Sequence, residues 1–259
     1  MNLPDFGLGA LEADLWRLVF VMVRIGAAFM AAPIFGAASV PVQVRIVLSG
    51  AVAVFVLAWV PVAAPDNLLS VYGLLAIVGE VVIGLSFGFL LTLSFTAAVM
   101  AAEQIGGAMG MAIATAVDPN TGGQSGALGQ YFTLALTLIF LGIGGHLIWL
   151  RLIVDSYTAL PPGTWLGAER AITIAGFASA MFVAAVAIAL PVMLALLLVQ
   201  FATGVLSRSA PSLNLFSLGL PAGVIAGIAA LIAASPLISE QFVTLSGQAL
   251  DQIAAVMTS

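Results

Sequence analysis

Long apolar stretches separated by short polar connections dominate the sequence. Six of them can be marked, at residues 16–33, 46–64, 71–102, 127–150, 171–206 and 219–235. Apolar side chains run all round any helix drawn through these stretches, which is typical of helices buried in lipid or among other helices. Since about 20 apolar residues cross a bilayer, the pattern predicts an all-α integral membrane protein whose segments form helical hairpins.

Two of the stretches are too long for one simple crossing. No charged residue occurs from Ala171 to Ser207, and one helix of that length would extend about 55 Å, against a hydrocarbon core of about 30 Å. Pro191 removes a helical hydrogen bond near the middle, so we expect a kink, a strong tilt or a broken helix. The stretch 71–102 carries Glu80 in its first half. Six segments therefore need not mean six independent crossings.

Glycines recur at four-residue spacing in three places along the chain. Such spacing places small residues on one helix face, where another helix can approach closely. The sequence does not decide whether that second helix belongs to the same chain or to another subunit, and in a chain with 27 glycines chance spacing is an alternative. The glycines are Gly84 and Gly88, Gly106 and Gly110, and Gly219, Gly223 and Gly227.

The connection at residues 103–126, EQIGGAMGMAIATAVDPNTGGQSG, is apolar and rich in glycine. Each glycine inside a helix costs about 1 kcal/mol relative to alanine, so a continuous helix is not expected, and Asp118-Pro119-Asn120 is a turn signal. We expect a soft, compact segment in a protein-lined or pore-like space, in which methionines fill irregular gaps. An ordinary helix end followed by a linker is the alternative. The candidate gating residues are Gly106, Gly107, Met109, Gly110, Met111, Asp118, Pro119, Gly122 and Gly123.

Glu80 is an ionisable residue inside an apolar stretch, where a charge is costly and suggests a function. A proton relay would need a second carboxylate at helical spacing, and none is present. We therefore favour a salt bridge to Arg24 or Arg17, which lie seven residues apart and hence on one helix face.

The composition is that of a membrane protein, and it excludes several kinds of metal-binding and phosphate-binding site. Of the 259 residues, 63% are hydrophobic and 7% charged, against about 25% charged in an ordinary soluble domain, and the mean hydropathy is +1.23. The chain has no Cys, no Lys and one His. Thiolate metal sites, the lysine of a phosphate-binding loop and a paired-histidine zinc site are therefore excluded. We predict no catalytic residue, cofactor or metal, and no nucleic-acid partner because no basic face is visible.

Four sequence blocks carry a family resemblance. They are VRIGAAFMAAPIFGAASVPVQVR from Val23, the stretch 103–119 ending in AVDP, FLGIGGHLIWLRLIVDSYTALPPG from Phe140, and ALPVMLALLLVQFATGVLSRSAPSLNLFSLGLP from Ala189. In this order they resemble the FliR family, the flagellar branch of the FliR/SctT group of type III export-gate proteins. The strongest signature is SRSAPSLNLF in the fourth block.

The resemblance implies a structural, non-enzymatic role in protein export. FliR-like proteins form one subunit of a gate in the bacterial inner membrane, within the flagellar basal body, together with FliP and FliQ and in contact with FlhB, FlhA and membrane lipid. Unfolded flagellar proteins pass through its channel. The resemblance implies a FliP-like part at residues 1–170, a FliQ-like part at 171–259, and a plug at the glycine-rich connection. It also makes Arg208, Pro211 and Asn214 candidates for subunit contacts, and the spaced glycines Gly219, Gly223 and Gly227 are further candidates.

Other functions stay open at this point. An injectisome subunit of the SctT type would share most of these features. A small-molecule secondary transporter would account for Pro191, Glu80 and the re-entrant-looking connection, although no convincing internal repeat relates the two halves of the chain. An intramembrane hydrolase is disfavoured because no combination of Ser, His and acid and no paired Asp motif occurs.

Overall fold

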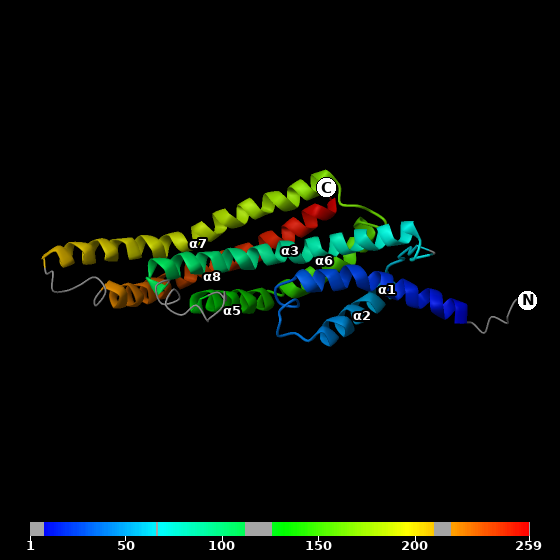
Figure 1. The fold of residues 1–259 in the computed structure, drawn as a ribbon, viewed down its shortest axis with the longest axis horizontal. Helices are drawn as coiled ribbons and strands as arrows, with labels where there is room; N and C mark the ends of the chain where they lie inside the picture. Colours follow the sequence, from blue (N-terminus) through cyan, green and yellow to red (C-terminus); the bar gives the residue numbers. More distant parts are fainter. Residues whose placement is uncertain (1–7, 66, 112–125, 210–218, 259) are drawn as a thin grey trace, which may run out of the picture. The chain divides into compact units, whose positions relative to one another are not determined.

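The computed structural model describes residues 8–65, 67–111, 126–209 and 219–258, and every regular element among them is a helix (Figure 1). This confirms the all-α fold class. In chain order the helices are α1 (Leu8–Ala31), α2 (Val42–Trp59), α3 (Val71–Ala108), α5 (Ala127–Gly142), α6 (Gly145–Ala159), α7 (Ala168–Ser209) and α8 (Leu220–Thr258).

The described helices include four, α2, α3, α7 and α8, that are long and apolar enough to cross a membrane. The bent pair α5 and α6 makes a fifth if it counts as one span. The predicted number of six segments is therefore not confirmed. Helices α3, α7 and α8 contain 38, 42 and 39 residues, so each extends well beyond a hydrocarbon core of about 30 Å.

The predicted stretch 127–150 is two helices rather than one. Helices α5 and α6 meet at an angle of 69°. Gly144, between them, has φ +73°, a left-handed backbone conformation that costs glycine little and other residues more. The run Gly-Ile-Gly-Gly at 142–145 therefore turns the chain inside an otherwise uninterrupted apolar stretch.

Three predicted boundaries also change. Helix α7 continues through Pro191 without a break, and α8 continues through Pro236 to Thr258, well past the predicted end at 235. In α8 the Ser235 hydroxyl donates to the Ile232 carbonyl at 2.9 Å, the acceptor that the missing proline N–H leaves free. Helix α3 extends to Ala108, so the connection expected from residue 103 begins with a helix end, as in the alternative interpretation of this stretch.

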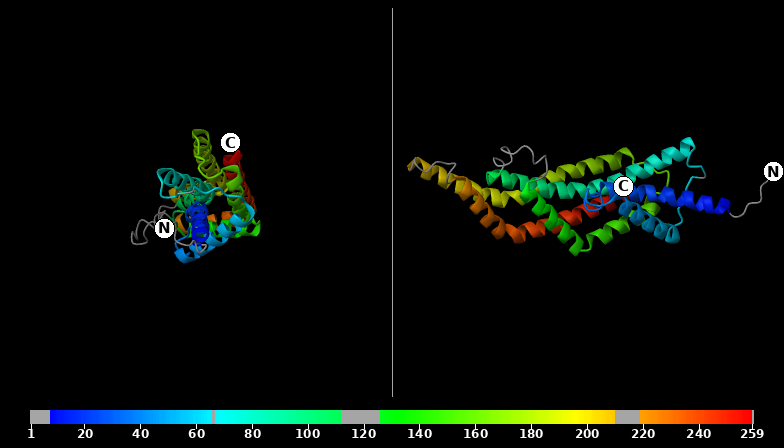
Figure 2. Two further views of the ribbon diagram at one scale, coloured as in Figure 1. Left: turned by 90° about the vertical axis from the view of Figure 1, so that its right-hand side faces the viewer. Right: turned by 60° about the horizontal axis from the view of Figure 1, so that its bottom comes forward.

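The chain forms two compact units that are not contiguous in sequence. Unit 1 comprises residues 1–93, 145–177 and 249–259, and unit 2 comprises residues 94–144 and 178–248. In unit 1, α1 and α2 lie side by side (Figures 1 and 2). The core of unit 1 includes the stacked rings of Phe29, Phe35 and Trp149. In unit 2, Phe132 of α5 meets Phe242 of α8 edge to face, with ring centroids 5.4 Å apart.

Two of the spaced glycines pack α3 against α1 within unit 1. A Cβ atom at Gly84 would collide with the backbone carbonyl oxygen of Arg24, and one at Gly88 would lie 2.5 Å from the carbonyl oxygen of Ala28. Backbone atoms cannot move aside as the end of a flexible side chain can. The small residues therefore allow this helix pair to come closer than larger side chains would permit, and the partner helix belongs to the same chain.

We predict that Gly84→Ala lowers the thermal stability of the purified protein, because the added methyl group forces α3 away from α1 at a cost of about 1–3 kcal/mol. The matched control is Gly26→Ala on α1, where no atom lies within 4 Å of an added Cβ. Thermal unfolding in detergent, followed by tryptophan fluorescence, measures both. Equal midpoints for the two variants would contradict the close contact.

Candidate functional site

An arginine from α1 and a glutamate from α3 form a buried ion pair in unit 1. Arg24 Nε donates to Glu80 Oε2 at 2.7 Å, and Arg24 Nη2 donates to Glu80 Oε1 at 2.8 Å. Such two-pronged pairs are among the strongest hydrogen-bonded contacts in proteins, and both side chains have 0% exposure. Arg17 instead lies 3.9 Å from Asp14, with both side chains exposed. The structure therefore brings Glu80 to Arg24 and not to Arg17.

The same guanidinium group also binds the C-terminal end of α6. Arg24 Nη1 donates to the Ser156 carbonyl and hydroxyl oxygens at 2.9 and 3.0 Å, and Nη2 donates to the Leu160 carbonyl at 2.8 Å. The Ser156 carbonyl also accepts the backbone N–H of Leu160 at 2.8 Å. The positive charge of Arg24 thus lies at the C-terminal end of α6, where the helix dipole favours it.

The guanidinium group of Arg24 uses all of its hydrogen-bond donors. A guanidinium has five N–H donors, and the five bonds of Arg24 use all of them. Arg24 also stacks over the ring of Tyr157, 4.3 Å from its centroid, and the Tyr157 hydroxyl donates to Val21 of α1 at 2.7 Å. Each oxygen of Glu80 accepts from Arg24. This arrangement joins three helices, α1, α3 and α6, through one buried side chain.

The second candidate region is the end of α3 in unit 2. Gly106 and Gly107 lie in its last turn, and Gly110 follows with φ +84°, as is common where a helix stops. Gln200 of α7 donates Nε2 to the Ala108 carbonyl at 2.7 Å, which satisfies an acceptor left free at the helix end. A side chain from another helix therefore fixes the point at which α3 ends.

Met109 fits against two of the spaced glycines of α8. Its side chain is 4% exposed. A Cβ atom at Gly227 would lie 2.7 Å from both Met109 Sδ and Cε, and one at Gly223 would lie 3.1 Å from the Met109 carbonyl oxygen. The two glycines thus form a seat for this methionine, and Met109 of the same chain covers this part of α8.

Glu103 links the end of α3 to the start of α5. Its Oε1 atom accepts the backbone N–H of Gly126 at 2.9 Å, and Gly126 is the N-cap of α5. A carboxylate is favoured at this position because the N-terminus of a helix carries partial positive charge. The described residues on both sides of 112–125 are therefore joined by one hydrogen bond.

The remaining predicted positions are less informative. Arg208 is exposed in the last turn of α7, and Met111 and Gly219 are half-buried. The described residues contain no group of three or more His, Asp or Glu side chains arranged to hold a metal ion. Six predicted residues lie outside the described part of the chain: Asp118, Pro119, Gly122, Gly123, Pro211 and Asn214.

The sequence did not predict the backbone carbonyls that bind Arg24 or the glutamine side chain that binds the end of α3. Ser156 and Leu160 contribute backbone carbonyls, which no side-chain pattern reveals, although the Pro-Pro pair at 161–162 marks the helix end that Arg24 caps. Gln200 is a polar residue in a long apolar stretch, which is a signal that could have been followed. Nothing local in the sequence connects it to Ala108, since 92 positions separate the two residues.

Comparison with known proteins gives consistent matches along most of the chain. The family described as bacterial export proteins, family 1, matches residues 15–249. Flagellar biosynthetic protein FliR from Escherichia coli (strain K12) is 32% identical over 222 residues, covering 84% of each chain. FliR from Bacillus subtilis (strain 168) is 34% identical over 208 residues, 78% of this chain and 80% of the relative. Surface presentation of antigens protein SpaR from Shigella sonnei is 33% identical over 141 residues, 54% of this chain and 55% of the relative.

We predict that Glu80→Ala destabilises the protein by about 3–5 kcal/mol, because it leaves the Arg24 charge buried without its partner. The control is Asp155→Ala, which removes the pair between Arg151 and Asp155 on an exposed face of α6. Such surface pairs contribute about 0–1 kcal/mol. Thermal unfolding of both variants measures the difference, and a small, equal effect would contradict the importance of the buried pair.

A double substitution tests the ion pair between Arg24 and Glu80 separately from the hydrogen bonds of Arg24 to the end of α6. Exchanging the charges, Arg24→Glu with Glu80→Arg, should not restore stability, because the new carboxylate would face the carbonyls of Ser156 and Leu160. Recovery to the stability of the unmodified protein would show that only the pair matters and that the helix-capping bonds are dispensable.

Proposed function

The chain belongs to the bacterial export proteins, family 1, and we propose that it is a structural, non-enzymatic channel subunit of the flagellar type III protein export gate. In this proposal it forms, with FliP and FliQ, the pore for unfolded flagellar proteins. It lies in the inner membrane at the flagellar basal body and contacts FlhB and FlhA. Its residues 1–170 correspond to a FliP-like part and 171–259 to a FliQ-like part.

The main support for the proposal is the family match, which extends from residue 15 to residue 249. A similarity of that extent includes every described helix in whole or in part. The flagellar branch is favoured over an injectisome subunit because the FliR proteins of Escherichia coli and Bacillus subtilis match 84% and 78% of the chain, and the SpaR protein matches 54%.

The exposed apolar surface supports a role within an assembly. Large apolar side chains on α2 and α7 are mostly exposed, among them Val47 at 71%, Trp59 at 76% and Phe201 at 73%. Large apolar side chains exposed in such numbers need lipid or another protein against them. A gate subunit would place part of that surface against helices of FliP and FliQ.

We further propose that the end of α3 belongs to the plug of the channel. A closed gate must stop ions yet open for chains of any sequence, and a deformable apolar seal meets both needs better than a ring of fixed charges. Residues 106–110 suit such a seal. Their glycines at 106, 107 and 110 leave the backbone free to deform, and the thioether of Met109 can adapt its shape to fill gaps. The seat of Met109 on Gly223 and Gly227 would hold the closed arrangement.

Co-expression tests the assembly. We expect the chain to purify as a stable complex only when FliP and FliQ are produced with it, and native mass measurement should give one composition containing all three proteins. Expression with an unrelated polytopic membrane protein is the control. A stable, monodisperse chain purified alone, which binds a small solute, would instead indicate a secondary transporter.

A substitution in the methionine seat tests the plug. Gly227→Ala places a methyl group among the side-chain atoms of Met109, so Met109 must move and the closed assembly should conduct ions. Gly247→Ala, on the same helix with no atom within 4 Å of the added Cβ, is the matched control. Proton flux into vesicles containing the purified assembly measures the leak. Equal flux in both variants would argue against a sealing role for Met109.

A further inference from the structure

Gln200 is a polar side chain in a surface of α7 that is otherwise apolar. None of residues 181–199 has a polar side chain, and the neighbours Leu197, Leu198 and Phe201 are 60%, 71% and 73% exposed. An amide group among such side chains is costly unless it is hydrogen-bonded. Gln200 meets this requirement within its own chain, because its Nε2 atom donates to the Ala108 carbonyl at 2.7 Å.

The acceptor of this bond lies where α3 stops. Helix α3 ends at Ala108, and the carbonyls of the last turn of a helix lack intrahelical partners. The next two residues turn back on the helix: the Met109 N–H bonds to the Ile105 carbonyl at 2.9 Å, and the Gly110 N–H bonds to the Gly107 carbonyl at 3.0 Å. The donor for the Ala108 carbonyl therefore comes from another helix.

Two helices of unit 2 hold two adjacent residues at this point. Helix α7 holds Ala108 through the Gln200 amide, and α8 holds Met109 on the seat formed by Gly223 and Gly227. The second contact is apolar and depends on shape, so it has little directional preference. The hydrogen bond is directional, and it fixes the backbone from which the Met109 side chain extends.

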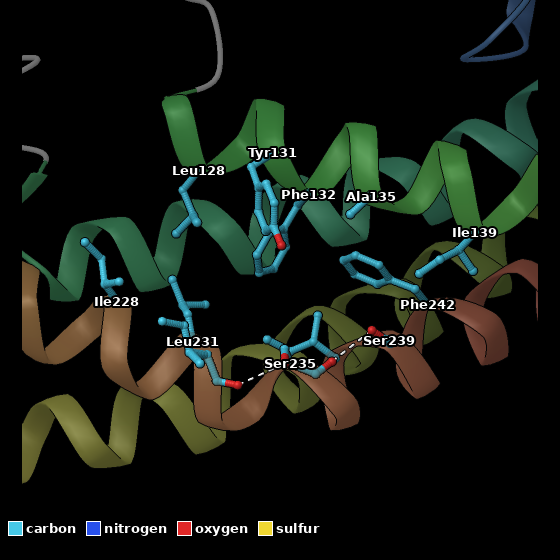
Figure 3. Close-up of a pocket in the computed structure, with 12 residues that line it drawn as sticks. Leu128, Tyr131, Phe132, Ala135, Ile139, Ile228, Leu231, Ser235, Ser239 and Phe242 are labelled. Atoms are coloured by element: carbon cyan, nitrogen blue, oxygen red, sulfur yellow. Dashed lines mark hydrogen bonds between the residues drawn. The ribbon is translucent and has the colours of Figure 1, made fainter.

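Hydroxyl groups on the same two helices do not make such a contact. Those of Thr203, Ser207, Ser235 and Ser239 each donate to a carbonyl three or four residues earlier in their own helix, at 2.9–3.0 Å, and Figure 3 shows the two serines of α8. Short polar side chains on a helix commonly bond in this way. Of these five polar side chains, only the longer Gln200 donates to another helix.

We propose that Gln200 is a positioning residue that latches the end of α3. While its amide donates to the Ala108 carbonyl, Met109 stays on α8 and the plug is closed. When this one hydrogen bond breaks, residues 108–110 can leave α7 and α8. Opening separates no charges and requires only rotation of the Gln200 side chain, so the latch can close again. Because residues 106–110 belong to the plug only in the function proposed above, this role rests on that function.

Hydrogen exchange measures the latch directly. Gln200→Met keeps the length of the side chain and removes the donor. One hydrogen bond of about 1 kcal/mol corresponds to a change of about fivefold. In the purified full chain the amides of Met109 and Gly110, which open with the end of α3, should exchange faster by that factor. The matched control is Gln248→Met, at an exposed glutamine of α8 that has no hydrogen bond among the described residues. Equal exchange in the two variants would overturn the latch.

Gln200→Glu separates the hydrogen bond from packing. The side chain keeps its shape, but an ionised carboxylate has no donor, so exchange at pH 7 should again be about fivefold faster than in the unmodified protein. At pH 4 most of the introduced carboxyl groups are protonated and can donate, so most of this excess should disappear, whereas Gln200→Met stays fast. Glu103 and the other carboxylates titrate in the unmodified protein too, which is therefore measured at each pH. An excess that persists at pH 4 would show that packing holds α3 and would overturn the proposal.

Proton flux into vesicles containing the purified assembly connects the latch to the gate. Gln200→Met should raise the flux at pH 7, and Gln248→Met should not. If Gly227→Ala leaks and Gln200→Met does not, the latch role is overturned and the plug remains. If neither variant leaks, the plug itself is wrong, and the bond between Gln200 and Ala108 is not part of a gate.

Discussion

The organisation of unit 1 depends on hydrogen-bonding a guanidinium group in an apolar interior. Such a charge is tolerated only when a counter-ion and acceptors surround it. Arg24 reaches both at once, through the Glu80 carboxylate on α3 and the carbonyls at the end of α6. Gly84 lies four residues beyond Glu80, and the backbone of Arg24 packs directly on it. The close helix contact and the ion pair therefore require each other.

Unit 2 uses weaker and more adaptable contacts at the end of α3. An amide side chain binds one carbonyl, a carboxylate accepts the N–H of the N-cap residue of α5, and a methionine packs on two glycines. None of these contacts buries an ion pair, and each can be broken at a cost of about one hydrogen bond or one small apolar contact. A segment held in this way is better suited to rearrangement than the cluster around Arg24.

The apolar surface of the chain serves two different kinds of neighbour. Broad exposed faces on α2 and α7 present large side chains to lipid or to helices of other subunits.

Hydropathy, motif order and a lone charge in an apolar stretch are all local properties, so the all-helical membrane character, the family resemblance and the importance of Glu80 could be predicted from the amino-acid sequence. It could not determine that α3 continues through its glycines, or that α7 and α8 continue through their prolines, since contacts with distant residues outweigh these local costs. Nor could it place Arg24 on the end of α6 or Met109 on α8. Those contacts join residues more than 100 positions apart, and only the packing of the helices brings them together.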